Sequence, residues 1–145
     1  MLLTACGTAA IVKTEYRLAQ GEKVRVELIA PPAATEEGMQ ILRERLAEQL
    51  ASSGLLAAPS DGSAKVLEVT VTNYSLRHGA ARAMLGIFAG TDNLQSSVKV
   101  KDRATGAVLS EFAVESKNAS AWGTSKGLLQ DHADQIVATL QGIKR

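Results

Sequence analysis

Residues 94–114 carry the pattern that most constrains the fold of this chain. Most alternate positions on both sides of a turn at residues 102–106 are apolar. They are Leu94, Val98 and Val100 before the turn, with Ser96 on the same face, and Val108, Phe112 and Val114 after it. This period of two is typical of strands with one buried face, so the segment predicts a hairpin. A one-residue slip in the pairing would turn Glu111 toward the core, which fixes the side-chain parity of the hairpin.

Three further segments alternate in the same way. Residues 24–28 and 67–71 predict strands that are rich in β-branched residues, and residues 12–18 predict a weaker one. Residues 7–10 are small and predict a tether that precedes the folded domain.

Two helices are predicted from apolar residues that recur at intervals of three and four. Thr35 is placed to cap the first helix and Gly54 to end it, because a glycine readily takes the left-handed conformation of a helix C-cap. The apolar stripes consist of Met39, Leu42, Leu46 and Leu50 in the first helix, and of Leu129, Ala133, Ile136, Leu140 and Ile143 in the last.

The order of these elements predicts an α+β fold. It is a mainly antiparallel sheet of about four strands, in the order strand, helix, strand, strand, strand, helix, with both helices on one face. The expected division is an N-terminal segment and tether over residues 1–20 and a single domain over residues 21–145. A chain of 145 residues is long enough to bury one self-sufficient core.

The composition argues against several classes of partner. Sixteen basic and fifteen acidic residues give a formal charge of +1, which offers no excess to hold a phosphate backbone, so no nucleic-acid partner is expected. Aromatic residues make up 3%, too few for a stacking platform. No apolar stretch approaches the roughly 18 residues of a spanning helix.

The only cysteine lies in the sequence Leu3-Thr4-Ala5-Cys6-Gly7, which has the form of a lipoprotein processing site. In such a site the thiol of Cys6 receives a diacylglycerol that anchors the protein, and glycine at the next position fits the outer membrane of a Gram-negative cell. Only five residues precede Cys6, fewer than a signal peptide needs. Either the start of the gene lies upstream or the match is accidental.

Residues 80–90 form a connector with few polar side chains. One interpretation is that it folds back against its own sheet, with its backbone groups satisfied there. The other is a contact surface for a neighbouring subunit or for lipid, because exposed apolar area is costly in water. The residues expected to make that contact are Arg82, Met84, Leu85, Ile87 and Phe88.

Residues 82–90, with their arginine and glycine pattern, and the turn Asp102-Arg103-Ala104-Thr105-Gly106 resemble an uncharacterised family of short Gram-negative lipoproteins. The resemblance covers roughly residues 23–142. Members carry a domain of unknown function, and their element order is similar to that of small periplasmic domains in secretion and polysaccharide-export assemblies. The resemblance therefore implies an envelope protein that is able to form rings.

No set of residues predicts a reaction. His132 lies near Asp131 and Asp134 in the sequence, but neither shares its helical face, so a partly buried or solvated histidine is expected. His78 adjoins Arg77 and suggests a basic rim. Lys99 and Lys101 are expected to meet Glu111 or Glu115 across the hairpin.

We therefore expect a non-enzymatic protein without cofactor or metal, anchored by lipid on the periplasmic face of the outer membrane. It would bind other envelope proteins and copies of itself as a structural component of a secretion or export complex. The alternative is a carrier of a small ligand or lipid, whose pocket between sheet and helices is closed by residues 84–88.

Overall fold

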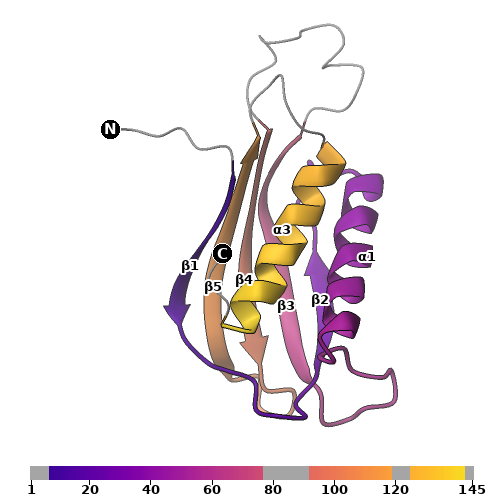
Figure 1. Ribbon diagram of the computed structural model, residues 1–145, viewed down its shortest axis with the longest axis vertical. Helices are drawn as coiled ribbons and strands as arrows, with labels where there is room; N and C mark the ends of the chain where they lie inside the picture. The colour runs from indigo at the N-terminus through magenta and orange to yellow at the C-terminus, as the bar shows by residue number, and fades with distance from the viewer. Residues whose placement is uncertain (1–6, 77–91, 119–124, 143–145) are drawn as a thin grey trace, which may run out of the picture.

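The computed structural model describes residues 7–76, 92–118 and 125–142. Within these ranges the chain forms one sheet with two helices on one of its faces (Figure 1). The elements are β1 (Gly7–Thr14), β2 (Val24–Ile29), α1 (Glu36–Ser52), β3 (Lys65–Ser75), β4 (Asp92–Lys101), β5 (Val108–Asn118) and α3 (Ser125–Leu140).

The sheet has five strands in the order β1-β5-β4-β3-β2. β2 and β3 are parallel, and the other three pairs are antiparallel. The α+β class and the helices on one face agree with the prediction from the sequence. The expected count of about four strands was one short of the five observed, because the expected order left out the weak strand predicted over residues 12–18. A strand does precede β2, but it lies at Gly7–Thr14.

The additional strand is β1, which pairs along its length with β5 at the edge of the sheet. Gly7–Ala10 belong to this strand, so the prediction of a tether at these residues was wrong. Thr8 and Ala10 are half-buried while Ala9 and Ile11 are exposed. Because these side chains are all short, their hydrophobicity shows no clear alternation along the sequence. Their strand conformation is set by the pairing with β5.

α1 begins and ends as its sequence predicts. The Thr35 hydroxyl accepts a hydrogen bond from the Gly38 N–H at 3.1 Å, and Gly54 has a φ of +71°. After this glycine the N–H of Leu55 bonds to the carbonyl of Leu50 at 2.8 Å, which closes the last turn.

The core lies between the two helices and the sheet. The apolar stripe of α1 and the α3 residues Leu129, Ala133, Ile136 and Leu140 face the inward side chains of β3, β4 and β5. Ile143, the last residue of the predicted stripe, lies outside the described residues. The two helices are also joined by the Arg45 guanidinium, which donates from Nε and Nη2 to the Asp134 carboxylate at 2.7 and 3.0 Å. This two-point contact raises the pKa of Arg45 further above its usual range.

The turn between β4 and β5 matches the prediction, but one neighbouring residue does not. Asp102 Oδ1 accepts from the N–H groups of Ala104 and Thr105, at 2.9 and 3.1 Å. The register shifts by one residue between Val100 and Lys101, so Val108 pairs with Lys101 and is 45% exposed. The expectation that Val108 faces the core was therefore wrong, because a bulge next to a turn reverses the parity of the pairing.

The face of the sheet opposite the helices is polar. Lys101 Nζ lies 2.6 Å from Glu68 Oε2, and Lys13 Nζ lies 3.8 Å from Glu111 Oε1. The expected partners of Lys101 on β5 were wrong, since Glu68 stands on β3, the strand on the other side. Neither described helix is long and apolar enough to cross a membrane.

Candidate functional site

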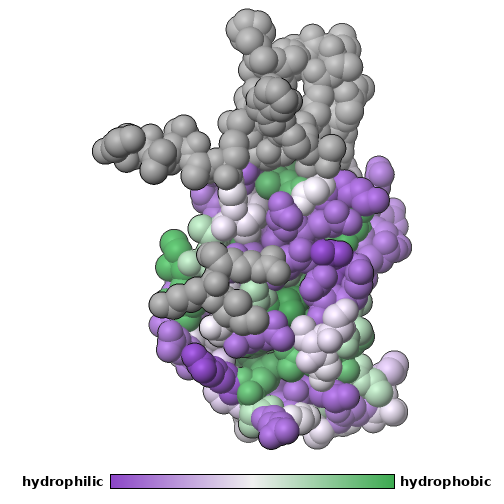
Figure 2. All heavy atoms as spheres, viewed as in Figure 1, coloured by the Kyte–Doolittle hydropathy of each residue, from purple (hydrophilic) through white to green (hydrophobic). Residues whose placement is uncertain are grey.

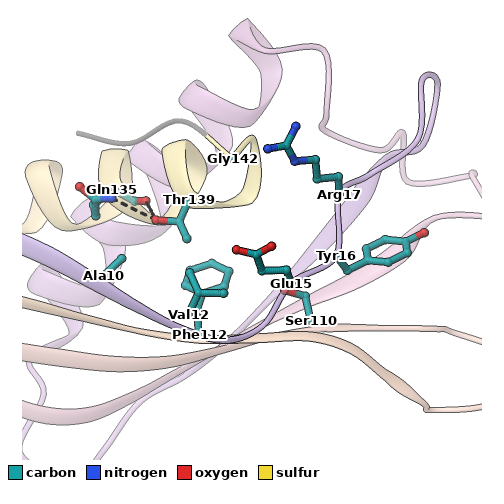
Figure 3. Close-up of a pocket in the computed structure, with 10 residues that line it drawn as sticks. All are labelled: Ala10, Val12, Glu15, Tyr16, Arg17, Ser110, Phe112, Gln135, Thr139 and Gly142. Atoms are coloured by element: carbon teal, nitrogen blue, oxygen red, sulfur yellow. Dashed lines mark hydrogen bonds between the residues drawn. The ribbon is translucent and has the colours of Figure 1, made fainter.

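A pocket of about 380 Å³ lies beside the edge strand β1, between the sheet and the C-terminal half of α3 (Figure 3). α3 packs over β5, β1 and β4, and the pocket lies where Val12 of β1 remains 44% exposed. Its walls come from β1 and the segment after it, from β5, and from the end of α3. The lining residues are Ala10, Val12, Glu15, Tyr16, Arg17, Ser110, Phe112, Gln135, Thr139 and Gly142.

Most polar groups around the pocket already have a partner. Gln135 Nε2 donates to the Thr139 hydroxyl at 3.0 Å, and that hydroxyl donates to the Gln135 carbonyl at 2.8 Å. Ser110 Oγ donates to the carbonyl of Thr14 at 2.9 Å. These groups are therefore not aimed at a ligand.

Tyr16, Glu15 and Arg17 follow one another along the rim. The Tyr16 phenol points away from the pocket and donates to both carboxylate oxygens of Glu22, at 3.2 and 3.0 Å (Figure 3). This hydrogen bond is the main cause that raises the pKa of Tyr16. Glu15 and Arg17 are exposed. The pocket thus has an apolar floor and a charged rim, which suits an apolar side chain or a short acyl chain better than a reacting group.

A second feature is a histidine inside the core. His132 is completely buried, with Nε2 2.8 Å from Ser96 Oγ and Nδ1 2.7 Å from Ser116 Oγ. Ser116 Oγ also lies 2.8 Å from Thr8 Oγ1. A neutral imidazole donates one hydrogen bond and accepts one, so two hydroxyl partners satisfy it fully. The chain of bonds links α3 to β4, β5 and the edge strand β1.

The contact between Ser96 and His132 has the distance of a nucleophile and its base, but its surroundings do not suit catalysis. Ser96 is 2% exposed and His132 is 0% exposed, so no substrate reaches them. Burial lowers the pKa of His132 from 6.5 to about 3 because the charged imidazolium would lose its hydration, which makes it a poor base at neutral pH. We interpret the network as structural.

The prediction for this histidine was different. A partly buried or solvated His132 was expected, and the structure corrects this to full burial with two serine partners. Asp134, near it in sequence, pairs with Arg45. The sequence did hold a signal for buried polar partners. Ser96 and Ser116 stand an even number of residues from Val98 and Val114 in their strands, so they share the inward face with these valines.

The residues predicted to make contacts lie outside the described ranges. These are Cys6 and the set Arg82, Met84, Leu85, Ile87 and Phe88. The expected lid of the carrier hypothesis, residues 84–88, also lies there. Among the described residues no group of three or more histidine, cysteine, aspartate or glutamate side chains is placed to hold a metal ion.

Comparison with known proteins assigns the chain to a family. The model of a domain of unknown function, DUF4410, matches residues 29–122, more than half of the chain. The chain belongs to this family. The predicted resemblance to a family with a domain of unknown function is confirmed by this match. No curated protein matches this chain significantly.

Solved structures share the fold of this DUF4410 protein. Two dodecamer structures of PelC from Paraburkholderia phytofirmans are 20% and 18% identical, with TM-scores of 0.67 and 0.68, and each match covers 95% of this chain and 99% of the other. A candidate lipoprotein from Caulobacter crescentus CB15 is 20% identical over 81% of this chain and 88% of its own, with a TM-score of 0.47, too low to support an argument. The PelC matches extend the shared fold beyond the family match at both ends.

Proposed function

We propose that this protein is a self-associating, lipid-anchored component of a cell-envelope assembly for secretion or export, which works by binding and not by catalysis. The observation that carries the proposal is the shared fold with PelC, which covers nearly all of both chains and whose structures are dodecamers. A single domain that corresponds almost completely to one subunit of a dodecamer supports self-association.

The surface of the domain supports self-association. Ile11 and Val12 on β1 are 70% and 44% exposed, and Ile29 on β2 is 46% exposed. Hydrophobic surface is visible along the β1 margin at the left of Figure 2. These residues stand at the two opposite edges of the sheet, and contacts between two different surfaces generate rings when the rotation closes.

The lipid anchor is proposed to be a diacylglycerol on Cys6, with the domain on the periplasmic face of the outer membrane. The lipobox Leu3-Thr4-Ala5-Cys6-Gly7 supports it. Gly7 at the start of β1 lies in one row of the sheet with the end of β3 and the start of β4. The connector between β3 and β4, which contains the apolar residues 80–90, therefore leaves and re-enters the sheet at the end where the lipid would be attached.

Metabolic labelling tests the anchor. Cells that express the protein from its complete gene with radiolabelled palmitate are expected to yield a labelled protein in the outer-membrane fraction. The Cys6→Ser variant, which lacks the acceptor thiol, is the matched control and should remain unlabelled. An unlabelled wild-type protein in the soluble fraction would refute lipid anchoring.

The pocket beside β1 favours one alternative, a carrier of a small apolar ligand, because its volume of about 380 Å³ is within the range of ligand sites. Native mass spectrometry of the Cys6→Ser chain at high micromolar concentration separates the two proposals. An assembly subunit is expected to appear as multiples of its own mass. A monomer that retains a lipid-sized adduct would contradict self-association and support the carrier.

A further inference from the structure

Both edges of the sheet leave backbone groups for another strand. β1 pairs only with β5, and β2 pairs with β3. On the open side of β2, the Val24 N–H bonds to the Leu55 carbonyl at 2.8 Å and the Val24 carbonyl accepts from the Ala57 N–H at 2.9 Å. Because backbone groups in a strand alternate in direction, those of Val26 and Leu28 point to the same side. No strand in the described part of the chain pairs with them.

The topology fixes the direction in which the two edges would meet. β1, β4 and the reverse of β5 share one direction, while β2 runs with β3 in the opposite direction. When two copies stand side by side in the same orientation, β1 of one copy therefore lies antiparallel to β2 of the next. This contact joins two different edges, so it is head-to-tail and leaves each end copy with one open edge.

The register follows from one row of side chains that crosses the sheet. Ile29, Thr70, Ser97, Ala113 and Ile11 are successive partners from β2 to β1, so the two isoleucines stand on the same face at the two ends of one row. Placing Ile11 opposite Ile29 of the next copy continues the row across the boundary at the same level. It buries two exposed isoleucines against each other.

The same register brings opposite charges together. Counting in antiparallel order from Ile11 and Ile29 sets Val12 opposite Leu28. Lys13, which stands at the register shift between Val12 and Thr14, comes next and lies at the level of Glu27. The Lys13 side chain is 62% exposed and only 3.8 Å from Glu111, a loose contact. Glu27 is exposed, makes no ion pair with the described residues, and stands directly beside Glu68 in the register of β2 and β3. Glu68 already pairs with Lys101, and a cation from the next copy supplies a partner for Glu27.

Other registers lose these matches. A slip of one residue turns the side chains of β1 to the wrong face relative to β2. A slip of two residues in one direction sets Lys13 opposite Arg25, a like charge, and in the other direction sets Lys13 opposite Ile29. Of the neighbouring registers, only the pairing of Ile11 with Ile29 matches both the apolar and the charged positions.

We propose that copies of this chain associate by antiparallel pairing of β1 with β2 of the next copy, with Ile11 opposite Ile29 and Lys13 opposite Glu27. The inference rests on the proposed self-association and specifies its interface. It gives the exposed edge strands, which are otherwise templates for indiscriminate pairing, a defined partner.

Disulfide trapping tests the register. In the full chain with Cys6→Ser, the pair Ile11→Cys and Ile29→Cys is expected to form a ladder of covalent multimers on non-reducing gels, because directly opposite residues have Cβ atoms within bonding reach. Each single variant should stop at dimers. The control pair Ile11→Cys and Arg25→Cys, shifted by four residues, should give no ladder.

The outcomes separate the interface from the self-association. A protein that is oligomeric by native mass spectrometry but gives no ladder with the opposed pair refutes the proposed interface and leaves the proposed function intact. A protein that is monomeric and gives no ladder refutes both.

Charge reversal provides a second test that does not depend on cysteine chemistry. Lys13→Glu or Glu27→Lys alone is expected to weaken association by about three- to tenfold in sedimentation equilibrium, because each sets like charges opposite one another at an exposed contact. The double reversal should restore most of the affinity. Equal weakening by the double reversal would contradict the pairing of these two residues.

Discussion

Acidification from pH 7 to pH 5 is expected to lower the free energy of unfolding by about 2 kcal/mol through His132 alone. In the folded protein its pKa is about 3, lowered from 6.5 by burial. The unfolded chain therefore binds a proton as the pH falls below about 6.5, while the folded chain binds none until about 3. The contribution of His132 to stability is therefore fully present above about pH 6.5. It is lost progressively as the pH falls from 6.5 toward 3, by up to about 1.4 kcal/mol for each pH unit.

Urea unfolding at a fixed protein concentration, followed by circular dichroism at several pH values between 7 and 5, measures this effect. His132→Gln should flatten the pH dependence in this range, although it also lowers stability at pH 7 by disturbing the bonds to Ser96 and Ser116. His78→Gln, which changes the other histidine of the chain, is the control and should leave the slope in place. An unchanged slope in His132→Gln would show that another group titrates.

Gly38→Ala is expected to destabilise the fold by about 1–3 kcal/mol, opposite to the gain of about 1 kcal/mol that helix propensity alone gives. Gly38 is buried in the first turn of α1, and a Cβ there would collide with the Tyr74 hydroxyl and lie 2.9 Å from its Cζ. The Tyr74 ring is 7% exposed, and its hydroxyl lies 2.9 Å from Thr35 Oγ1, the capping atom of the helix. The ring therefore has little room to move.

Thermal or urea unfolding of Gly38→Ala in two backgrounds measures this collision. In the Tyr74→Phe background the hydroxyl is absent, so the cost of Gly38→Ala should fall by more than half. Gln40→Ala, an exposed change two residues further along α1, is the matched control and should alter stability by less than about 0.5 kcal/mol. If Gly38→Ala stabilises the fold instead, β3 and its Tyr74 side chain must shift at little cost to make room for the added methyl group.

The parts of the fold that the sequence predicted are those with strong periodicity. The stripes of α1 and α3, the Thr35 cap and the β4–β5 hairpin follow from local rules that the tertiary structure reinforces. β1 was not recognised over its whole length because Gly7–Ala10 are small, and an edge strand gains its order from a partner far along the chain. Val108 was misplaced because a single extra residue in a bulge cannot be read from alternation.

The candidate site was harder to predict. The pocket joins residues from β1, β5 and α3 that range from Ala10 to Gly142 along the chain and carry no motif. The partners of His132 come from two strands, and neither serine is near it in sequence. The opposed isoleucines at the two sheet edges became visible only once the strand order was known, since register relates Ile11 to Ile29 through three intervening strands.

β1 begins at Gly7, directly after Cys6, and Gly7 is already paired with Lys117. One residue spans at most about 3.6 Å, so the polypeptide between a lipid on Cys6 and the sheet would be very short. The distance between the domain and the membrane would therefore vary little from copy to copy. Every copy would then present its two sheet edges at the same height above the lipid, and the membrane plane itself would align neighbours before they touch.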